Sequence, residues 1–173
     1  MDDDPALATR ARAAGAALKR RGWSAATAES CTGGGIAQAL TTIGGSSEWF
    51  DRGFVTYSNE AKQELLDVSA ATLAAHGAVS AETAAAMARG ALAHASAQVA
   101  VSVTGVAGPT GGSAAKPVGT VWFGFAVRGG ETHTRHRLFT GDRQAIRRQA
   151  VLYALDGLRT LAEGGQPAVS AEG

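Results

Sequence analysis

Two glycine-rich loops, each following a strand-like apolar segment, constrain most strongly what this chain can fold into. The first loop, residues 30–35, follows the segment 23–28 and leads into a helical pattern. The second, residues 105–119, follows the alternating valines of 98–105. Ligands of open α/β folds bind at the carboxyl ends of strands, where glycine lets the backbone approach a ligand. Either loop alone is more typical of a plain turn, but together they favour an α/β fold with a ligand site.

The rest of the chain alternates helices and strands. We expect the first helix to begin at Asp4 and end at Gly22, and a glycine pair to join segments 120–128 and 132–140 as a hairpin. Further elements are expected as a helix at 35–44, an extended segment within 45–59, a helix at 60–68, a short helix after Ser69, and helices at 81–96 and 143–163. Asn59, Ser69, Ser80 and Asp142 are the expected helix caps. The order helix, strand, helix, strand, three helices, three strands, helix predicts a three-layer α/β/α domain on a mixed β-sheet.

Length and charge narrow the classes of function. The 173 residues fit one domain, which we expect at 1–163, followed by a loose tail at 164–173. The net charge of +1 gives no overall field to gather nucleic acid or anionic membranes. No segment reaches the roughly 20 apolar residues of a membrane helix, and the acidic start lacks a signal-peptide core. We therefore expect a cytoplasmic protein with no nucleic-acid or membrane partner.

The metal-binding residue types are sparse. Cys31 is the only cysteine, so neither an internal disulfide nor a cysteine zinc site can form. The four histidines are scattered, and His133 and His136 have opposite parity on one expected strand. We find no metal-ligand spacing and no local Ser-His-Asp motif. The sequence therefore predicts neither a metal site nor a cofactor.

The stretch AESCTGGG, residues 28–35, places two candidate nucleophiles in front of three glycines. Ser30 also suits a helix cap, and Cys31 also suits a small buried packing residue. Neither glycine loop matches a Walker loop or a dinucleotide fingerprint. The residues alone leave open whether this turn only bends the chain or holds a nucleophile over a substrate.

Six motifs occur in a recognisable order along the chain. They are TAESCTGG (27–34), YSNEAK (57–62), GAVS (77–80), VTGVAGPTGG (103–112), KPVGTVW (116–122) and FTGDRQAIRRQAV (139–151). Together they resemble the CinA C-terminal family, the nicotinamide-nucleotide amidases, over almost the whole chain. The resemblance implies hydrolysis of nicotinamide mononucleotide to nicotinate mononucleotide and ammonia. Because the chain has no room for the larger N-terminal domain of many members, we expect the stand-alone form. We also expect self-association, because small-residue helix surfaces often pair.

The resemblance also implies a catalytic group of Ser30, Tyr57, Lys62 and Thr104. In this hypothesis Ser30 attacks the carboxamide and Lys62 takes the proton of the Ser30 hydroxyl. Tyr57 or Thr104 relays this proton or orients the reacting groups. A lysine base requires burial or nearby positive charge, because a free lysine has a pKa of about 10.4. Each residue also has a structural interpretation. Ser30 can cap a helix and Lys62 can be a solvated helix lysine. Tyr57 can be a half-buried sheet residue, and the Thr104 hydroxyl can satisfy backbone groups of its loop. Cys31 ranks behind Ser30 as the nucleophile.

The substrate-binding residues are expected on both loops and on the last helix. On the first loop they are Glu29, Cys31, Thr32, Gly33 and Gly34, with the amides near Gly33 and Gly34 as oxyanion donors. On the second loop they are Gly105, Ala107 and Gly108. Arg143 and Arg147 are four residues apart, so they share a helix face and suit a phosphate, whereas Arg148 points elsewhere. An exposed basic stripe is the alternative interpretation of these arginines.

Two positions depart from the family pattern. Gly35 stands where an apolar residue is usual, and Asp67 stands where glycine is common. Both lie beside the motif residues. Two other classes stay open: a binding module without catalysis, which would not need both Ser30 and Lys62, and a hydrolase of another amide or of a phosphate ester on the same scaffold.

Overall fold

A computed structural model of the protein, which describes residues 4–168, contains one five-stranded sheet in the order β2–β1–β3–β4–β5. The strands are β1 (Ala25–Glu29), β2 (Phe50–Val55), β3 (Val99–Gly105), β4 (Thr120–Val127) and β5 (Thr132–Leu138). β1 pairs in parallel with both β2 and β3, whereas β4 is antiparallel to β3 and to β5. The carboxyl ends of β2, β1 and β3 therefore meet at one edge of the sheet.

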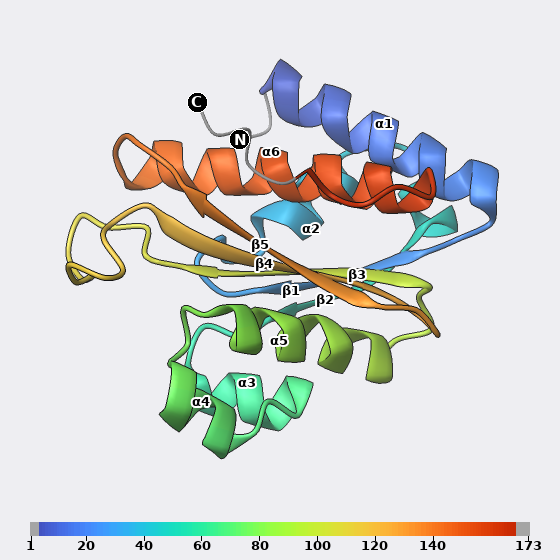
Figure 1. Cartoon of the computed structure of the whole chain (residues 1–173). Coiled ribbons are helices and arrows are strands. Elements are labelled where there is room, and N and C mark those ends of the chain that lie inside the picture. The colour runs from blue at the N-terminus through green and yellow to red at the C-terminus, as the bar shows by residue number, and fades with distance from the viewer. Residues whose placement is uncertain (1–3, 169–173) are drawn as a thin grey trace.

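Helices cover both faces of this sheet (Figure 1). One layer holds α1 (Pro5–Arg21), α2 (Gly35–Thr41) and α6 (Arg143–Ala162). The opposite layer holds α3 (Asn59–Leu66), α4 (Ala70–His76) and α5 (Ala81–Ala93), of which α5 lies against the sheet while α3 and α4 pack on α5. A 3-10 turn, η1 (Ser46–Glu48), precedes β2. The three-layer α/β/α fold on a mixed sheet is confirmed, as is the order of its elements.

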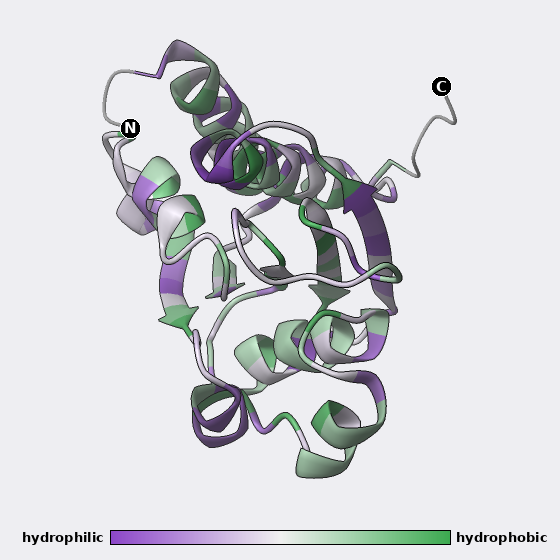
Figure 2. Ribbon diagram, turned by 90° about the vertical axis from the view of Figure 1, so that its left-hand side faces the viewer, coloured by the Kyte–Doolittle hydropathy of each residue, from purple (hydrophilic) through white to green (hydrophobic). Residues whose placement is uncertain are grey.

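The two faces of the central strands carry different side chains, and this difference explains the two layers. The valines of β3 and the phenylalanines of β4 lie in the core beneath α1 and α6. Ala26 and Ala28 of β1 and Ala100 of β3 face α5, whose own buried residues are also mostly small. Small residues on both sides let α5 approach the sheet closely. By contrast, the edge strand β5 is hydrophilic along most of its length (Figure 2).

The helix caps follow the sequence with one exception. Side chains of Asp4, Ser69, Ser80 and Asp142 accept hydrogen bonds from the first turns of their helices. The prediction that Asn59 caps α3 is wrong: Ser58 does so, since its hydroxyl accepts from the Ala61 N–H at 3.0 Å. Asn59 is instead the first residue of the helix. The two neighbouring residues are both good caps, so local propensity could not separate them.

Asp67 ends α3 in the left-handed conformation, with φ of 57°. Aspartate tolerates this region better than most residues, although glycine enters it without steric cost. This backbone angle accounts for a glycine preference at the position.

The chain after α6 runs back along the sheet. The Tyr153 hydroxyl donates to the carbonyl of Ala168 at 2.6 Å, and Arg135 Nε donates to the carbonyl of Pro167 at 2.8 Å. Of the tail expected at 164–173, residues 169–173 lie outside the described residues. Within residues 4–168, no helix combines the length and the hydrophobicity that a bilayer-spanning segment needs.

Candidate active site

A pocket of about 410 Å³ opens at the edge where the parallel strands end. Small-molecule sites have volumes of roughly 300–1,000 Å³, so the pocket can take a ligand of mononucleotide size. Its walls include the predicted residues Ser30, Cys31, Tyr57, Lys62, Thr104, Gly105, Ala107, Gly108 and Arg143. Glu29, Thr32, Gly33, Gly34 and Arg147 are not among its lining residues. Both glycine loops therefore reach one site.

Ser30 stands directly after β1, at the start of the turn that leads into α2. Its amide N–H donates to the carbonyl of Val103 on the neighbouring β3 at 3.0 Å. Its own carbonyl accepts from the Gly33 N–H at 3.0 Å and so closes the turn. Gly33 and Gly34 have φ of 59° and 98°, a region that other residues rarely adopt. The glycines are thus required for the turn that presents Ser30.

The oxyanion donors expected near these glycines are already engaged. The Gly33 N–H is bonded to Ser30, and the Gly34 N–H is directed at the Glu29 carboxylate. Among residues 4–168, no backbone carbonyl accepts from the amide N–H of Cys31. Unlike the two glycine amides, the amide that immediately follows Ser30 is therefore not held by another backbone group of the described residues or by Glu29.

Lys62 is the largest fully buried side chain of the described residues, with 1 % of its surface exposed. It lies in the first turns of α3, and its Nζ donates to Ser30 Oγ at 3.1 Å, to the Thr56 carbonyl at 2.8 Å and to the Tyr57 carbonyl at 3.3 Å. No ion pair of residues 4–168 includes Lys62. Burial lowers the pKa of Lys62, because the ammonium loses hydration without gaining a carboxylate partner.

Cys31 borders the pocket but belongs to the apolar core beneath α6. Burial raises the pKa of its thiol to about 12. The thiolate is the nucleophilic form of cysteine, so this thiol is almost entirely unreactive near neutral pH. Ser30 Oγ, by contrast, lies 3.1 Å from Lys62 Nζ.

Glu29 ends β1 and points away from the pocket into the start of α2. Its carboxylate accepts from the Ile36 N–H at 2.8 Å, the Ala37 N–H at 3.0 Å and Thr32 Oγ1 at 2.7 Å. The N-cap of α2 is Gly34, which has no side chain to satisfy those amides. Burial raises the pKa of Glu29, and these hydrogen bonds oppose the shift. Glu29 and Thr32 hold the helix start rather than facing the site.

Tyr57 and Thr104 contribute in different ways. The Tyr57 side chain is 61 % exposed at the mouth of the pocket, and its hydroxyl accepts from Arg143 Nη2 at 3.1 Å. Only its backbone carbonyl contacts Lys62. The buried hydroxyl of Thr104 donates to the carbonyl of Ala78 at 2.8 Å, which ties the end of β3 to the loop before α5. Neither hydroxyl hydrogen-bonds to Ser30 or Lys62.

The arginines of α6 have separate environments. Arg143 reaches the pocket, where its Nη1 donates to the carbonyl of Gly108 at 2.8 Å. Arg147 lies one turn further along and donates to two carbonyls of the serine turn, those of Cys31 at 3.1 Å and Thr32 at 3.0 Å. Arg148 pairs with Asp4 on the surface, away from the site as expected. Arg143 and Arg147 therefore do not meet at one pocket wall.

The second glycine loop forms the opposite wall. A Cβ atom on Gly105 would come within 2.7 Å of the Thr120 carbonyl oxygen, and one on Gly108 within 2.5 Å of Val118. These positions need glycine for close packing of the loop on β4. Asn59, which the sequence indicates only as a helix cap, also lines the pocket. Its place directly after the YS of the YSNEAK motif was the signal that could have identified it.

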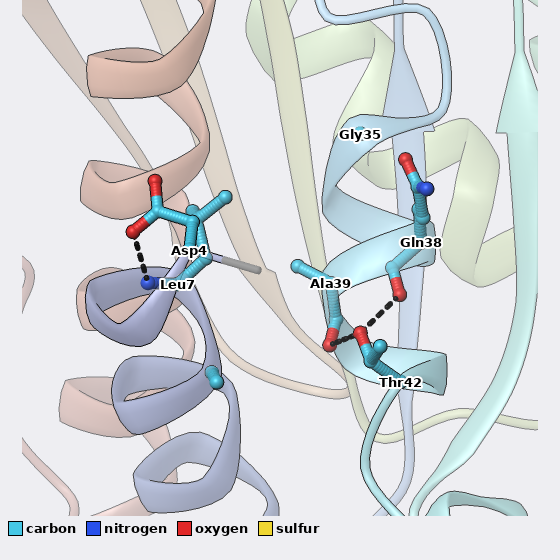
Figure 3. A pocket seen from close by; sticks show the side chains of 7 residues that line it. Asp4, Leu7, Gly35, Gln38, Ala39 and Thr42 are labelled. Atoms are coloured by element: carbon cyan, nitrogen blue, oxygen red, sulfur yellow. Dashed lines mark hydrogen bonds between the residues drawn. The ribbon is translucent and has the colours of Figure 1, made fainter. Parts of the chain in front are cut away.

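A second hollow lies between α1 and α2, around Asp4, Leu7, Gly35, Gln38, Ala39 and Thr42 (Figure 3). Its volume of about 20 Å³ is close to that of one ordered water, so it is far too small for a nucleotide. Within residues 4–168, no group of three or more His, Cys, Asp or Glu side chains is arranged to hold a metal ion. The pocket at Ser30 is the candidate active site.

The comparisons with known proteins agree with this fold and motif set. Residues 7–162 match the family model of the CinA C-terminal domain. The chain is 62 % identical over 141 residues to the nicotinamide-nucleotide amidohydrolase PncC of Enterobacter agglomerans, which covers 82 % of this chain and 86 % of that protein. It is 52 % identical over 161 residues to the protein of the same name from Pseudomonas putida, covering 93 % and 98 %.

A solved structure extends the comparison to three dimensions. The competence damage-inducible protein A of Klebsiella pneumoniae superposes with a TM-score of 0.85 at 44 % identity, covering 88 % of this chain and 94 % of that one. The family model spans most of the chain, and the relatives match it at high identity over most of their own length. The chain therefore belongs to the CinA C-terminal domain family.

Proposed function

We propose that the protein is an amidohydrolase that converts nicotinamide mononucleotide and water to nicotinate mononucleotide and ammonia, with Ser30 as nucleophile and Lys62 as base. The single observation that carries the proposal is the buried contact of 3.1 Å between Lys62 Nζ and Ser30 Oγ. The names of the relatives at 52–62 % identity support the choice of substrate.

As an ammonium, Lys62 donates to all three of its oxygen partners, and loss of one proton lets it accept from the Ser30 hydroxyl instead. A neutral amine has two N–H bonds and one lone pair. The carbonyls of Thr56 and Tyr57 can accept both N–H bonds, which turns the lone pair toward the hydroxyl of Ser30. The lowered pKa of Lys62 increases the fraction of neutral amine near physiological pH.

The reaction proceeds in two halves. Lys62 takes the Ser30 hydroxyl proton as Oγ forms a bond to the carboxamide carbon, and the amide N–H of Cys31 stabilises the oxyanion. The Lys62 ammonium then returns the proton to the leaving nitrogen, so the C–N bond breaks and ammonia departs. Neutral Lys62 next deprotonates a water molecule that attacks the acyl carbon, and the Lys62 ammonium then returns this proton to Ser30 Oγ as the ester bond breaks and nicotinate mononucleotide leaves.

Arg143 is the residue we assign to the substrate phosphate. Its guanidinium lies at the pocket wall between Tyr57 Oη and the Gly108 carbonyl, and an arginine fork suits phosphate geometry. Tyr57 and Asn59 also line the pocket. Binding of the phosphate there orients the nicotinamide ring toward Ser30.

The test is ammonia release from nicotinamide mononucleotide by the purified protein, beside Ser30→Ala and Cys31→Ala. We expect kcat to fall by at least about 10³-fold in Ser30→Ala and to stay within about threefold in Cys31→Ala. A wild type that releases no ammonia, but whose melting temperature rises with the nucleotide, would establish a binding module instead. Activity that survives in Ser30→Ala and is lost in Cys31→Ala would reverse the assignment of the nucleophile.

A further inference from the structure

Three arginines of α6 differ in what they touch, and Arg147 touches the turn that carries Ser30. Arg143 contacts the pocket wall and Arg148 contacts Asp4 at the surface. Half-buried Arg147 donates from Nε to the Cys31 carbonyl and from Nη2 to the Thr32 carbonyl. Arg147 does not line the pocket, and its guanidinium binds protein backbone rather than facing the substrate.

Resting on the proposed function, we propose that Arg147 is a positioning residue, which fixes the Cys31–Thr32 and Thr32–Gly33 peptide planes of the serine turn and does not bind the substrate phosphate. A trans peptide is planar, and its C=O and N–H point in opposite directions. Holding the Cys31 carbonyl toward α6 therefore directs the Thr32 N–H away from α6. The two guanidinium contacts leave the turn with little freedom to rotate.

The local sequence fits such a contact. The turn contains two glycines with positive φ, which would otherwise permit several backbone conformations. A Cβ atom at Gly33 would come within 3.4 Å of Arg147 Nη2, so the turn and the guanidinium pack closely. A charged donor also polarises each peptide it binds, here the two whose N–H groups belong to Thr32 and Gly33, and this strengthens the Gly33 N–H that closes the turn on the Ser30 carbonyl. Arg147 thus supplies both rigidity and charge to the backbone beside Ser30.

The experiment compares Arg147→Met with Arg143→Met and Arg148→Met on two substrates. The substrates are nicotinamide mononucleotide and nicotinamide riboside, which lacks the phosphate. We expect Arg147→Met to lower kcat by about 10- to 100-fold on both substrates by the same factor, with KM within about twofold. Arg147→Lys should recover part of the loss, because an ammonium can hold one of the two carbonyls.

The other arginines are the matched controls. Arg143→Met should raise KM for the mononucleotide much more than for the riboside, because its partner is the phosphate. Arg148→Met makes the same change of charge on the same helix, but away from the turn. It should therefore change neither kcat nor KM by more than about twofold. A rise in KM confined to the mononucleotide in Arg147→Met would overturn the proposal, as would unchanged kinetics.

A measurement without turnover separates this inference from the proposed function. If the wild type acts on neither substrate, the proposed amidase activity fails, but the backbone clamp can still be measured by hydrogen exchange. Amides of residues 30–36 should exchange at least about tenfold faster in Arg147→Met than in Arg148→Met at equal melting temperature. Equal exchange in the two variants would show that Arg147 does not hold the turn.

Discussion

Lys62 Nζ lies 3.1 Å from Ser30 Oγ, although the two residues stand 32 positions apart in the chain. β1 and β2 are parallel neighbours, so the residues that follow them come to one edge of the sheet. Ser30 follows β1 directly, and α3 begins a few residues after β2 and carries Lys62 back over that edge. The same arrangement buries the lysine without a carboxylate partner, and this has consequences for both activity and stability.

The rate should therefore depend on the protonation of Lys62. Because the neutral amine is the base, kcat/KM should rise as pH increases through the pKa of Lys62 and level off above it. Burial lowers that pKa from its usual value of 10.5, so the rise should come at lower pH than for a free lysine. Lys62→Met should reduce kcat by at least about 10²-fold. Exposed Lys19, in Lys19→Met, is the control; a profile without this rise would exclude Lys62 as the base.

The same group should make stability depend on pH. Between the lowered pKa of folded Lys62 and the unfolded value near 10.5, the unfolded chain binds more protons than the folded protein. The free energy of unfolding therefore gains a contribution from Lys62 as pH rises through this window. Urea unfolding between pH 7 and 10 should show this gain in the wild type and in Lys19→Met. If Lys62→Met keeps the same slope, the ammonium is not penalised in the folded state.

Glu29 should prove to be a stabilising residue. In Glu29→Gln the amide oxygen can still accept from α2, but the NH2 group would face an N–H that now has no acceptor. We expect a loss of about 1–3 kcal/mol in the free energy of unfolding, measured by urea denaturation. Glu60→Gln, on the exposed first turn of α3, is the matched control and should change stability by less than about 0.5 kcal/mol. Equal stability of the two variants would contradict the role of Glu29 as the cap of α2.

Much of the fold could be predicted because its signals are local. Aspartate and serine caps, the alternating valines of β3 and the glycine pair before β5 each act within a few residues. The cap of α3 was the exception, because Ser58 and Asn59 are adjacent and equally suitable. Which strands neighbour one another is not local, so the parallel pairing of β1 with β3, which brings the two glycine loops to one edge, could not be predicted from such signals.

The site was less accessible from the sequence, since its roles depend on how elements pack. Helix periodicity correctly put Arg143 and Arg147 on one face, but only the position of α6 over the serine turn separates their contacts. Likewise, Glu29 looks like a site residue beside Ser30, and strand alternation turns it toward α2 instead. A charged residue near a nucleophile can serve the backbone, and contacts in three dimensions decide which role it has.

The contact between α3 and α5 offers a test of how strictly the position of Lys62 matters. A Cβ atom at Gly90 would lie 1.9 Å from the carbonyl oxygen of Leu66, at the end of the helix that carries Lys62. Alanine is favoured over glycine in a helix by about 1 kcal/mol, but here it meets backbone that cannot rotate away. Gly90→Ala should push α3 outward, lower the free energy of unfolding by about 1–3 kcal/mol and reduce kcat. Gly44→Ala, with no atom within 4 Å of its Cβ, should be neutral in both measurements. Full activity with reduced stability would show that the Lys62–Ser30 contact survives movement of α3.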